Sequence, residues 1–471
     1  MLPSCTKIHP FSYVFFSEIM WYTLIALLCV LVSGKLFQKA SGTISIYRPH
    51  MMSIIFYLFF ILMSVVGAVL VVNHVDYHYM IDKLNYESSR IYGFWAVMYT
   101  IVAFPIGMLG ANRVFHVRNA RRLFDYYTSK PLTVELHYND VMVHRLLVGL
   151  SVISVLAVLY VLYVLREVPL LKLFSDGSAV EFAEFSNMTT RNFPGNQYVK
   201  NVLALTLTPF FSYVAYGYKL INNTRFNRWW FYILFVASIL IVSHNLAKAP
   251  LLLYGLGFLF IGVLRGNCLS LKSIIFVVGI ILLVLIFLYT QLMSETDIDL
   301  IQLFSYNSGI VGRIVLSAGA GMYLMIDLFP NYYHFFGGSS MSSFVSSMLG
   351  LDYSDRAARW VMAYVNPDGV AAGVAGVANS LFIGEAWANW GIAGVLLSPI
   401  YVGFIIQCLY IFVLRSPKTP FFVALLAFYS YKGSITGGMN DYIYNIQTLV
   451  FLSIILFVYG GSKLLSINKN G

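Results

Sequence analysis

Four basic residues in the second half of the chain have types and positions suited to binding phosphate: Lys248, Arg313, Arg356 and Arg359. Arg356 and Arg359 are three residues apart, so on a helix they would share one face. Two guanidinium groups on one face can bind a phosphate or diphosphate through paired N–H donors. The alternative is that these two arginines pair locally with Asp352 and Asp355 on a solvated surface.

Arg313 and Lys248 are candidates because ionisable side chains are costly at membrane depth, so each one there suggests a function. Arg313 lies inside an apolar run. Lys248 lies in the short hairpin Ser243-His-Asn-Leu-Ala-Lys-Ala-Pro250, between two apolar runs. His244 is in the same hairpin, so it can form a polar cluster with Lys248. The alternative is that the Lys248 side chain extends to the membrane interface and has no further role.

Glu385 is the first candidate for a general base. It lies in Gly384-Glu-Ala-Trp-Ala-Asn-Trp-Gly391, just before an apolar run. A carboxylate beside aromatic rings at the membrane edge is partly desolvated, which raises its pKa and suits a base. The alternative is a structural Glu that tethers the start of the following helix. His244 and Asp441 are the second choices for the base.

Several motifs of known catalytic sites are absent from the sequence. It has no Walker A loop, no GxGxxG, no His-x-x-Glu-His and no carboxylate pair like those that bind metal in nucleotide-sugar transferases. His74 and His78 are four residues apart and flank Asp76, but a metal ion normally needs more ligands. We therefore expect neither a metal nor a cofactor.

The elements that must position these groups are predicted to be membrane helices. The 471 residues are 59% hydrophobic and only 11% charged, with a mean hydropathy of +0.76. Ordinary soluble domains carry roughly 25% charged residues, and about 20 apolar residues suffice to cross a bilayer. We predict an all-α polytopic membrane protein, a single integral membrane domain over residues 1–471. It has about eleven spans (eleven to thirteen): about 12–34, 51–73, 92–110, 142–164, 201–221, 229–246, 249–265, 273–293, 391–414, 419–437 and 444–461. Lys432 lies inside the tenth, so we expect it to be paired or to face a cavity.

The charges predict how the spans are oriented. Lys and Arg favour cytoplasmic loops, so the basic loop 111–140 is placed inside, and alternation places 294–390 outside as one large loop. With helix residues assigned to the nearer face, the inner side has 18 basic and 3 acidic residues, and the outer side has 12 and 17. Topology thus accounts for the net charge of +10, and we do not predict nucleic-acid binding.

Residues 309–329 are long and apolar enough to be a further span, but they contain Arg313 and Asp327. If they crossed, the acidic segment 352–385 would turn inward and the charge pattern would break. We therefore predict an interfacial or re-entrant helix that packs on the bundle.

The order of these features resembles that of the Wzy-type polymerases, which polymerise the repeat units of bacterial O-antigen or capsule polysaccharides. The shared features are many spans, a mid-chain hairpin with Lys248, and a last large outer loop that begins near Arg313. That loop passes through Phe336-Gly-Gly-Ser-Ser340 and ends at 384–394. In many members it ends in Gly-Glu, a short aromatic spacer and Asn-aromatic-Gly-x-x-Gly, to which 384–394 is similar.

Two departures from that pattern occur in the motif. Ala386 separates Glu385 from Trp387, which affects the placing of the carboxylate, and Trp390 occupies the aromatic place that is often Phe. The match in residues is specific only in this short segment, whereas the match in architecture covers most of the chain.

The resemblance implies a metal-independent glycosyltransferase of the GT-C type in the bacterial inner membrane, with its active site facing the periplasm. Its substrate would be oligosaccharide units carried on undecaprenyl diphosphate. The growing chain would move from its lipid diphosphate onto the non-reducing end of the incoming unit. Its partners would be the lipid-linked oligosaccharide, membrane lipid and a chain-length regulator protein. The basic residues named above would neutralise the leaving diphosphate, and Glu385 would deprotonate the acceptor hydroxyl.

Two other functions share part of this pattern. A flippase or transporter for the same lipid-linked oligosaccharide should show two related halves and charged groups along a central path. The sequence shows no internal repeat, and its polar outer loop lies on one side only. An O-antigen ligase, which transfers finished polymer to a lipid A core, shares both the chemistry and the topology, so the sequence separates it poorly from a polymerase.

Overall fold

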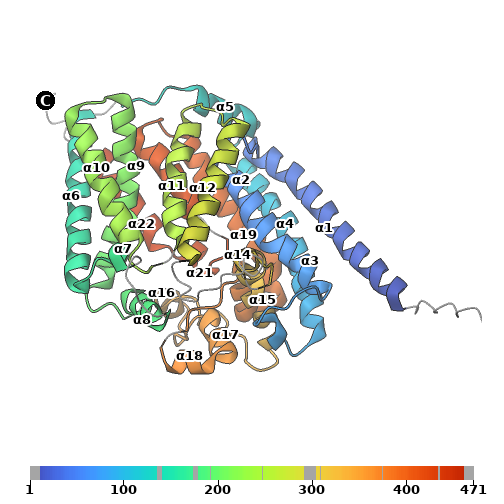
Figure 1. The fold of residues 1–471 in the computed structure, drawn as a ribbon. Coiled ribbons are helices and arrows are strands. Elements are labelled where there is room, and N and C mark those ends of the chain that lie inside the picture. Colours follow the sequence, from blue (N-terminus) through green and yellow to red (C-terminus); the bar gives the residue numbers. More distant parts are fainter. Residues whose placement is uncertain are drawn as a thin grey trace, which may run out of the picture.

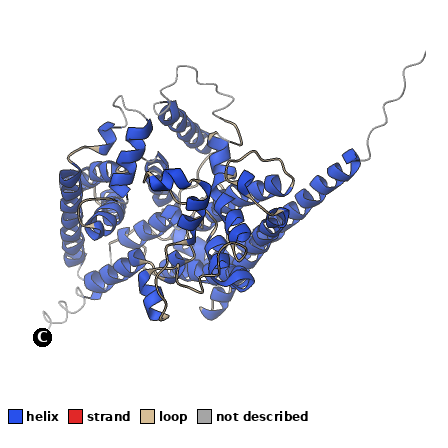
Figure 2. Ribbon diagram, turned by 90° about the horizontal axis from the view of Figure 1, so that it is seen from below, coloured by secondary structure: helices blue, strands red, loops and turns tan. Residues whose placement is uncertain are grey.

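The computed structural model describes residues 11–134, 140–172, 179–190, 192–246, 248–290, 304–307, 309–373, 375–432 and 435–460. Within these ranges the regular elements are all helices, and no strand occurs (Figure 2). Among the described residues, seven helices or helical stretches are long and apolar enough to cross a membrane, and one of them, Asn440–Gly460, is interrupted at Tyr444 and Asn445. This architecture is that of a polytopic helical membrane protein.

The seven candidate spans include three single helices (α4, α6 and α10), the bent helix α19, and three composite or partial ones. They are Met20–Ser41 within α1 (Phe11–Ser41); Met51–Val72, made of α2 (Met51–Ile54), η1 (Ile55–Val65) and α3 (Val66–Val72); α4 (Glu87–Val114); α6 (Asp140–Leu165); α10 (Arg225–Val242); α19 (Phe382–Arg415); and Asn440–Gly460, which contains α21 (Asn440–Ile443), α22 (Ile446–Ile455) and η4 (Leu456–Gly460). The other four predicted spans coincide with helices outside this set: η3 (Val199–Leu207) with α9 (Thr208–Ile221), α11 (Lys248–Leu264), α12 (Leu271–Thr290) and α20 (Pro420–Lys432).

The remaining helices are shorter and lie toward the two ends of the bundle (Figure 1). They are η2 (Ile81–Lys83), α5 (Ala120–Ser129), α7 (Pro169–Lys172), α8 (Ala179–Thr190), α14 (Ile310–Val315), α15 (Ser317–Leu328), α16 (Ser343–Met348), α17 (Ala357–Val365) and α18 (Pro367–Ala371). In Figure 1, α5 lies at the upper end, whereas α17 and α18 lie at the opposite end.

Helices α4 and α19 pack closely against each other. Two glycines allow their backbones to approach closely, because an added Cβ at Gly107 would collide with the Ile400 carbonyl, and one at Gly403 with the Phe104 carbonyl. Small residues commonly permit such close packing of membrane helices. α1 packs on α4 toward its C-terminal end, and its N-terminal half extends away from the bundle (Figure 1).

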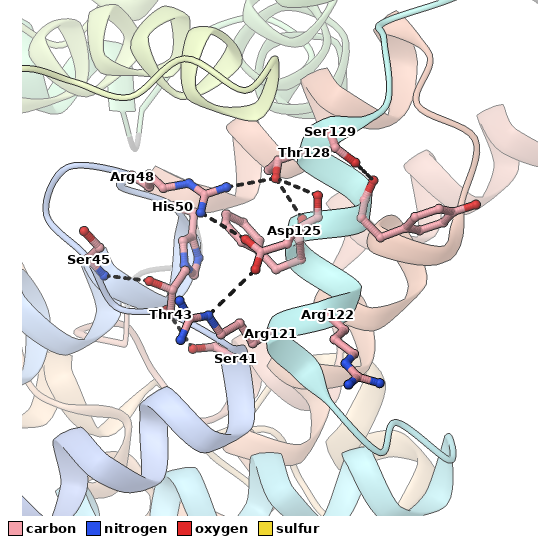
Figure 3. Close-up of polar contacts among 12 residues, drawn as sticks. Ser41, Thr43, Ser45, Arg48, His50, Arg121, Arg122, Asp125, Thr128 and Ser129 are labelled. Atoms are coloured by element: carbon pink, nitrogen blue, oxygen red, sulfur yellow. Dashed lines mark hydrogen bonds and ion pairs between the residues drawn. The ribbon is translucent and has the colours of Figure 1, made fainter.

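Loops that the charge pattern assigns to the inner side meet at one end of the bundle. Arg48 Nη1 contacts Asp125 Oδ1 at 3.0 Å, and its Nη2 donates to Thr128 Oγ1 at 3.0 Å (Figure 3). Lys418 Nζ donates to the carbonyl oxygens of Thr128 (2.9 Å) and Lys130 (2.6 Å). Three loops far apart in sequence therefore lie together, as the predicted alternation of spans requires.

Asp327 joins two of the segments predicted to lie outside. Its carboxylate is fully buried and accepts hydrogen bonds from the backbone N–H groups of Asn85 and Tyr86 (both 3.0 Å). The Asn85 Nδ2 (2.7 Å) and Ser89 Oγ (2.8 Å) groups also donate to it. Asp327 thus satisfies N–H groups at the start of α4, where a helix has no internal acceptors. Asp327 therefore has a structural role in this stretch.

The stretch 309–329 is not a single spanning helix. It breaks at Leu316 into α14 and α15, and the 12 residues of α15 rise about 18 Å, short of the ~30 Å hydrocarbon core. α15 is buried along most of its length and packs on α4, α17 and α19. The stretch therefore packs on the bundle, as predicted.

Candidate functional site

The segment 384–394 forms a sharp bend in α19. At Gly391 φ is +59° and ψ is −139°, a conformation that residues with a side chain rarely adopt. Residues eight apart in a straight helix are about 12 Å apart. An added Cβ at Gly394 would nevertheless collide with the carbonyl of Ala386. α19 is therefore two helices, 382–390 and the part after Gly391, which meet at a steep angle.

The Gly-Ser loop 336–340 is bound to this bend through Asn389. The Asn389 Oδ1 accepts a hydrogen bond from the Gly338 N–H (3.0 Å). Its Nδ2 donates to Ser340 Oγ and to the Glu385 carbonyl (both 2.8 Å). Asn389 is 1% exposed, so these bonds form in a dry environment where each is costly to lose. Two polar features that are about 50 residues apart in sequence thus form one structure.

Glu385 tethers the first half of α19 to the turn before α21. Its side chain is 3% exposed, and Oε2 accepts a hydrogen bond from the Asn440 N–H (3.0 Å). Gly438 lies so close that an added Cβ there would collide with the carboxylate. The prediction that Glu385 is the general base is not supported by this burial, because an acceptor hydroxyl has no open approach to it. The geometry favours the alternative, a structural tether.

Arg356 and Asp441 form an ion pair beside Glu385, with Arg356 Nη2 3.2 Å from Asp441 Oδ1. Their side chains are 39% and 45% exposed, and their charges act on the Glu385 carboxylate. Both line a cavity of about 610 Å³ together with Asn440 and Lys432. Lys432 is exposed, so it faces a cavity, as expected for an ionisable residue in an apolar helix. Among the described residues that line it, the cavity therefore holds two cations and one accessible carboxylate.

The prediction that Arg356 and Arg359 form a fork on one helix face is wrong. Arg356 precedes α17 as its N-cap, with φ −56° and ψ 140°, so the helix begins only at Ala357. Arg359 pairs instead with Asp355 at 2.9 Å, and both side chains are about half exposed, at 53% and 52%. The local-pairing alternative therefore describes Arg359, whereas Arg356 reaches across to Asp441.

The three remaining candidates lie elsewhere. His244 follows α10, is 8% exposed and is acted on by the charge of Lys432. Arg313 is exposed on α14. Neither occurs among the described residues that line the Arg356 cavity. Lys248 is the first residue of α11, but its side chain lies outside the described part of the chain.

An apolar groove of about 590 Å³ adjoins the polar cavity. It is formed by the part of α19 at and after the bend and by the segment around α21, and its lining includes Trp390, Leu397, Tyr401 and Met439. Ile443 lines both the groove and the cavity, so the two are neighbours. An apolar chain attached to a charged head could therefore occupy both at once.

Sequence reasoning missed the residues that hold the site together, namely Asn389, Gly438 and Asn440. Asn389 is visible only as the Asn of the motif, and its acceptor role depends on a loop about 50 residues away. The run Gly437-Gly-Met-Asn-Asp441 in the last outer loop was the available signal, because glycines beside polar residues mark close backbone approach.

The site shows no metal-binding cluster. Among the described residues, no group of three or more His, Cys, Asp or Glu is placed to hold a metal ion. His74 Nε2 lies 2.8 Å from Glu87 Oε1, and His78 Nε2 lies 2.8 Å from Ser317 Oγ.

Comparisons with protein-family models, with curated proteins and with solved structures find no match to this chain.

Proposed function

We propose that this chain is a membrane glycosyltransferase of the Wzy type. It polymerises oligosaccharide repeat units carried on undecaprenyl diphosphate, at the periplasmic face of a bacterial inner membrane. In this proposal all eleven predicted spans cross the bilayer, in a GT-C-like arrangement. The observation that carries the proposal is the cavity with Arg356, Lys432 and Asp441 beside an apolar groove. Helix α17, which begins directly after Arg356, lies at the end of the bundle opposite α5 (Figure 1).

The chemistry of such a transfer suits this cavity. The leaving group is a lipid diphosphate, and the transition state needs positive charge near the departing oxygens. Arg356 and Lys432 supply two cations from two different segments of the chain. The adjoining groove takes the first isoprene units of the lipid. Each such donor contributes on the order of 3 kcal/mol in a water-poor site. Charge from side chains makes a metal ion unnecessary in this reaction.

We assign the role of general base to Asp441 and a positioning role to Glu385. Asp441 is accessible in the cavity, whereas Glu385 is buried and bonded to the backbone of Asn440. When a diphosphate binds Arg356, it competes with Asp441 for the guanidinium. The released carboxylate can then take the proton of the acceptor hydroxyl. Loss of the ion pair thus couples donor binding to acceptor activation.

The first experiment uses the purified full-length protein with lipid-linked repeat units in a chelator and without nucleotide. The wild-type protein should produce a ladder of polymers. Asp441→Asn should lower the rate by roughly 10²–10⁴ because it removes the base, and Arg356→Gln by roughly 10²–10³. Arg359→Gln is the matched control and should retain the ladder, because that arginine pairs locally.

Substitutions of Glu385 distinguish a general base from a positioning residue. Glu385→Gln keeps an oxygen acceptor for the Asn440 N–H, so it should retain most activity, whereas Glu385→Ala should lose it. If Glu385→Gln were as inactive as Asp441→Asn, Glu385 would be the base. A wild-type ladder from both Asp441→Asn and Arg356→Gln would refute the proposed site altogether.

A ligase is distinguished by its product. With lipid-linked repeat units alone, a polymerase extends the lipid-linked chain. A ligase gives no product until a lipid A core acceptor is added. Transfer only to the core acceptor would refute the polymerase function, but it would remain consistent with the proposed chemistry of the cavity.

A further inference from the structure

A second cavity lies at the inner end of the bundle, between the C-terminal ends of α1 and α4 and the start of α5. Its volume is about 620 Å³, and it is lined by five basic side chains: Lys35, Lys39, Arg113, Arg118 and Arg121. No acidic residue is among the described residues that line it. We name this feature the basic pocket.

The charges of the basic pocket have little internal compensation. Among the described residues, no carboxylate lies within 4 Å of the amine or guanidine nitrogens of Lys35, Lys39, Arg113 or Arg118. Arg121 lies 3.8 Å from Asp125, but Asp125 is bonded more closely to Arg48 (Figure 3). Cations that converge on one cavity repel each other, so an anion that enters is attracted by all of them.

The backbone around the basic pocket favours an anion further. Asn119 is the N-cap of α5, and the first residues of this 10-residue helix line the pocket. A helix N-terminus carries partial positive charge and unsatisfied N–H groups. Gly42 has φ +92°, and an added Cβ would lie 2.7 Å from the backbone of Arg121. This tight contact holds the start of α5 against the end of α1.

An exposed apolar stripe on α1 leads from the bilayer to the basic pocket. Leu24, Leu28 and Leu31 are 52%, 62% and 65% exposed and recur at helical spacing, and Lys35 continues the same face. Few residues of this span are buried in the protein, and its N-terminal half stands apart from the bundle (Figure 1). Acyl chains can lie along such a stripe while a head group reaches the cations above it.

We propose that the basic pocket binds the head group of an anionic phospholipid of the inner leaflet, whose acyl chains pack on the Leu24–Leu31 stripe of α1. Basic pockets between membrane helices on the cytoplasmic side suit head groups with more than one phosphate, such as cardiolipin. Five cations exceed the need of one phosphate, so a lipid with two phosphates should bind most tightly. This site is separate from the proposed glycosyltransferase cavity and does not depend on it.

The inner charge excess by itself does not explain this arrangement. Orientation depends on how many Lys and Arg residues lie in short loops, and it does not require their side chains to meet in one cavity. Other inner cations, such as Arg122, Arg225 and Lys272, are exposed and do not occur among the described residues of the pocket. They therefore provide a control of equal charge.

The test measures lipid binding to the purified full-length protein by native mass spectrometry. Mixed micelles of cardiolipin, phosphatidylglycerol or phosphatidylcholine are the lipid probes, and inorganic pyrophosphate is the soluble probe. The triple variant Lys39→Gln, Arg113→Gln, Arg118→Gln should bind cardiolipin about 100-fold more weakly, at roughly fivefold per cation. The control variant Arg122→Gln, Arg225→Gln, Lys272→Gln should bind it like the wild-type protein.

Two outcomes of the triple-variant and pyrophosphate measurements overturn the proposal. An equal loss in both triple variants would mean that general surface charge attracts the lipid. Full displacement of cardiolipin by an equal concentration of pyrophosphate would make the pocket a site for soluble phosphate. If the pocket triple variant does not yield folded protein, the single variants Lys39→Gln and Arg113→Gln are measured instead. Each should lose about fivefold, and unchanged binding in both would refute the site.

Discussion

Replacement of Gly391 by alanine tests the bend on which the candidate site depends. A straight α19 predicts that the substitution stabilises the protein, whereas a bent α19 predicts that it destabilises it. In a straight helix, Gly→Ala stabilises the protein by about 1 kcal/mol through helix propensity. In the bent form, alanine must adopt φ +59° and ψ −139°, at a cost of about 1–3 kcal/mol. The added Cβ also lies 3.0 Å from the Phe335 ring, a contact that overpacks the site. Overpacking typically adds about 1–3 kcal/mol, so we expect Gly391→Ala to destabilise the protein by about 2–6 kcal/mol.

The assay is thermal unfolding of the purified protein in detergent, followed by intrinsic fluorescence. Gly149→Ala in α6 is the matched control, because no atom within 4 Å would meet its Cβ. It should leave the Tm unchanged or raise it slightly. Gly394→Ala is a second arm and should lower the Tm, because its Cβ would collide with the Ala386 carbonyl. A raised Tm for both Gly391→Ala and Gly394→Ala would show that α19 is continuous, and the reasoning about the site would fail.

Three further predictions concern other buried groups. Asp327→Ala should destabilise the protein by about 3–5 kcal/mol, since it removes the buried carboxylate that accepts hydrogen bonds from the backbone N–H groups of Asn85 and Tyr86; Tm reports this, and exposed Asp352→Ala should change little. Burial first, then the Arg48 charge, lowers the pKa of His50 to about 4 from its usual 6.5. The unfolded chain therefore binds the proton first as pH falls from 6.5 through 4, so stability drops in that window by up to about 3 kcal/mol; a Tm measured against pH should show it, and His50→Gln should flatten the curve. Gly438→Ala, whose Cβ would displace the Glu385 carboxylate, should cut polymer synthesis more than tenfold; wild-type activity in this variant would show that the tether has no role.

The helices were largely predictable from the sequence because apolar runs of membrane length have few alternative structures. The assignment of each loop to one end of the bundle or the other was also predictable, since the counts of Lys and Arg indicate the orientation without knowledge of any contact. The break at Leu316 was harder to foresee. A stretch with Arg313 and Asp327 can be placed beside the membrane by charge, but where its helix divides depends on what packs against it.

The candidate site was predictable in its parts and not in its pairings. Charge and motif identified Arg356, Glu385 and Asp441, and the structure places them together. Their roles depend on burial, which a sequence does not specify. Glu385 is buried because Gly438 and Asn440 pack against its carboxylate, and these two residues lie more than 50 residues away in sequence. The prediction that Arg356 and Arg359 share a helix face was wrong because α17 begins one residue after Arg356. The exact end of a short helix is harder to predict than the helix itself.

The cations at the two ends of the bundle are compensated differently, and this difference bears on both proposals. At the outer end Arg90 pairs with Asp76 at 2.7 Å, and Arg356 pairs with Asp441 at 3.2 Å. The proposed diphosphate would have to replace a carboxylate there, which would favour exchange and turnover over permanent binding. The cations of the basic pocket, such as Arg113 and Arg118, lack such carboxylates among the described residues. Because no carboxylate needs to be displaced from Arg113 or Arg118, an anion should remain bound. The same residue types therefore suit a transient substrate at one end and a resident lipid at the other.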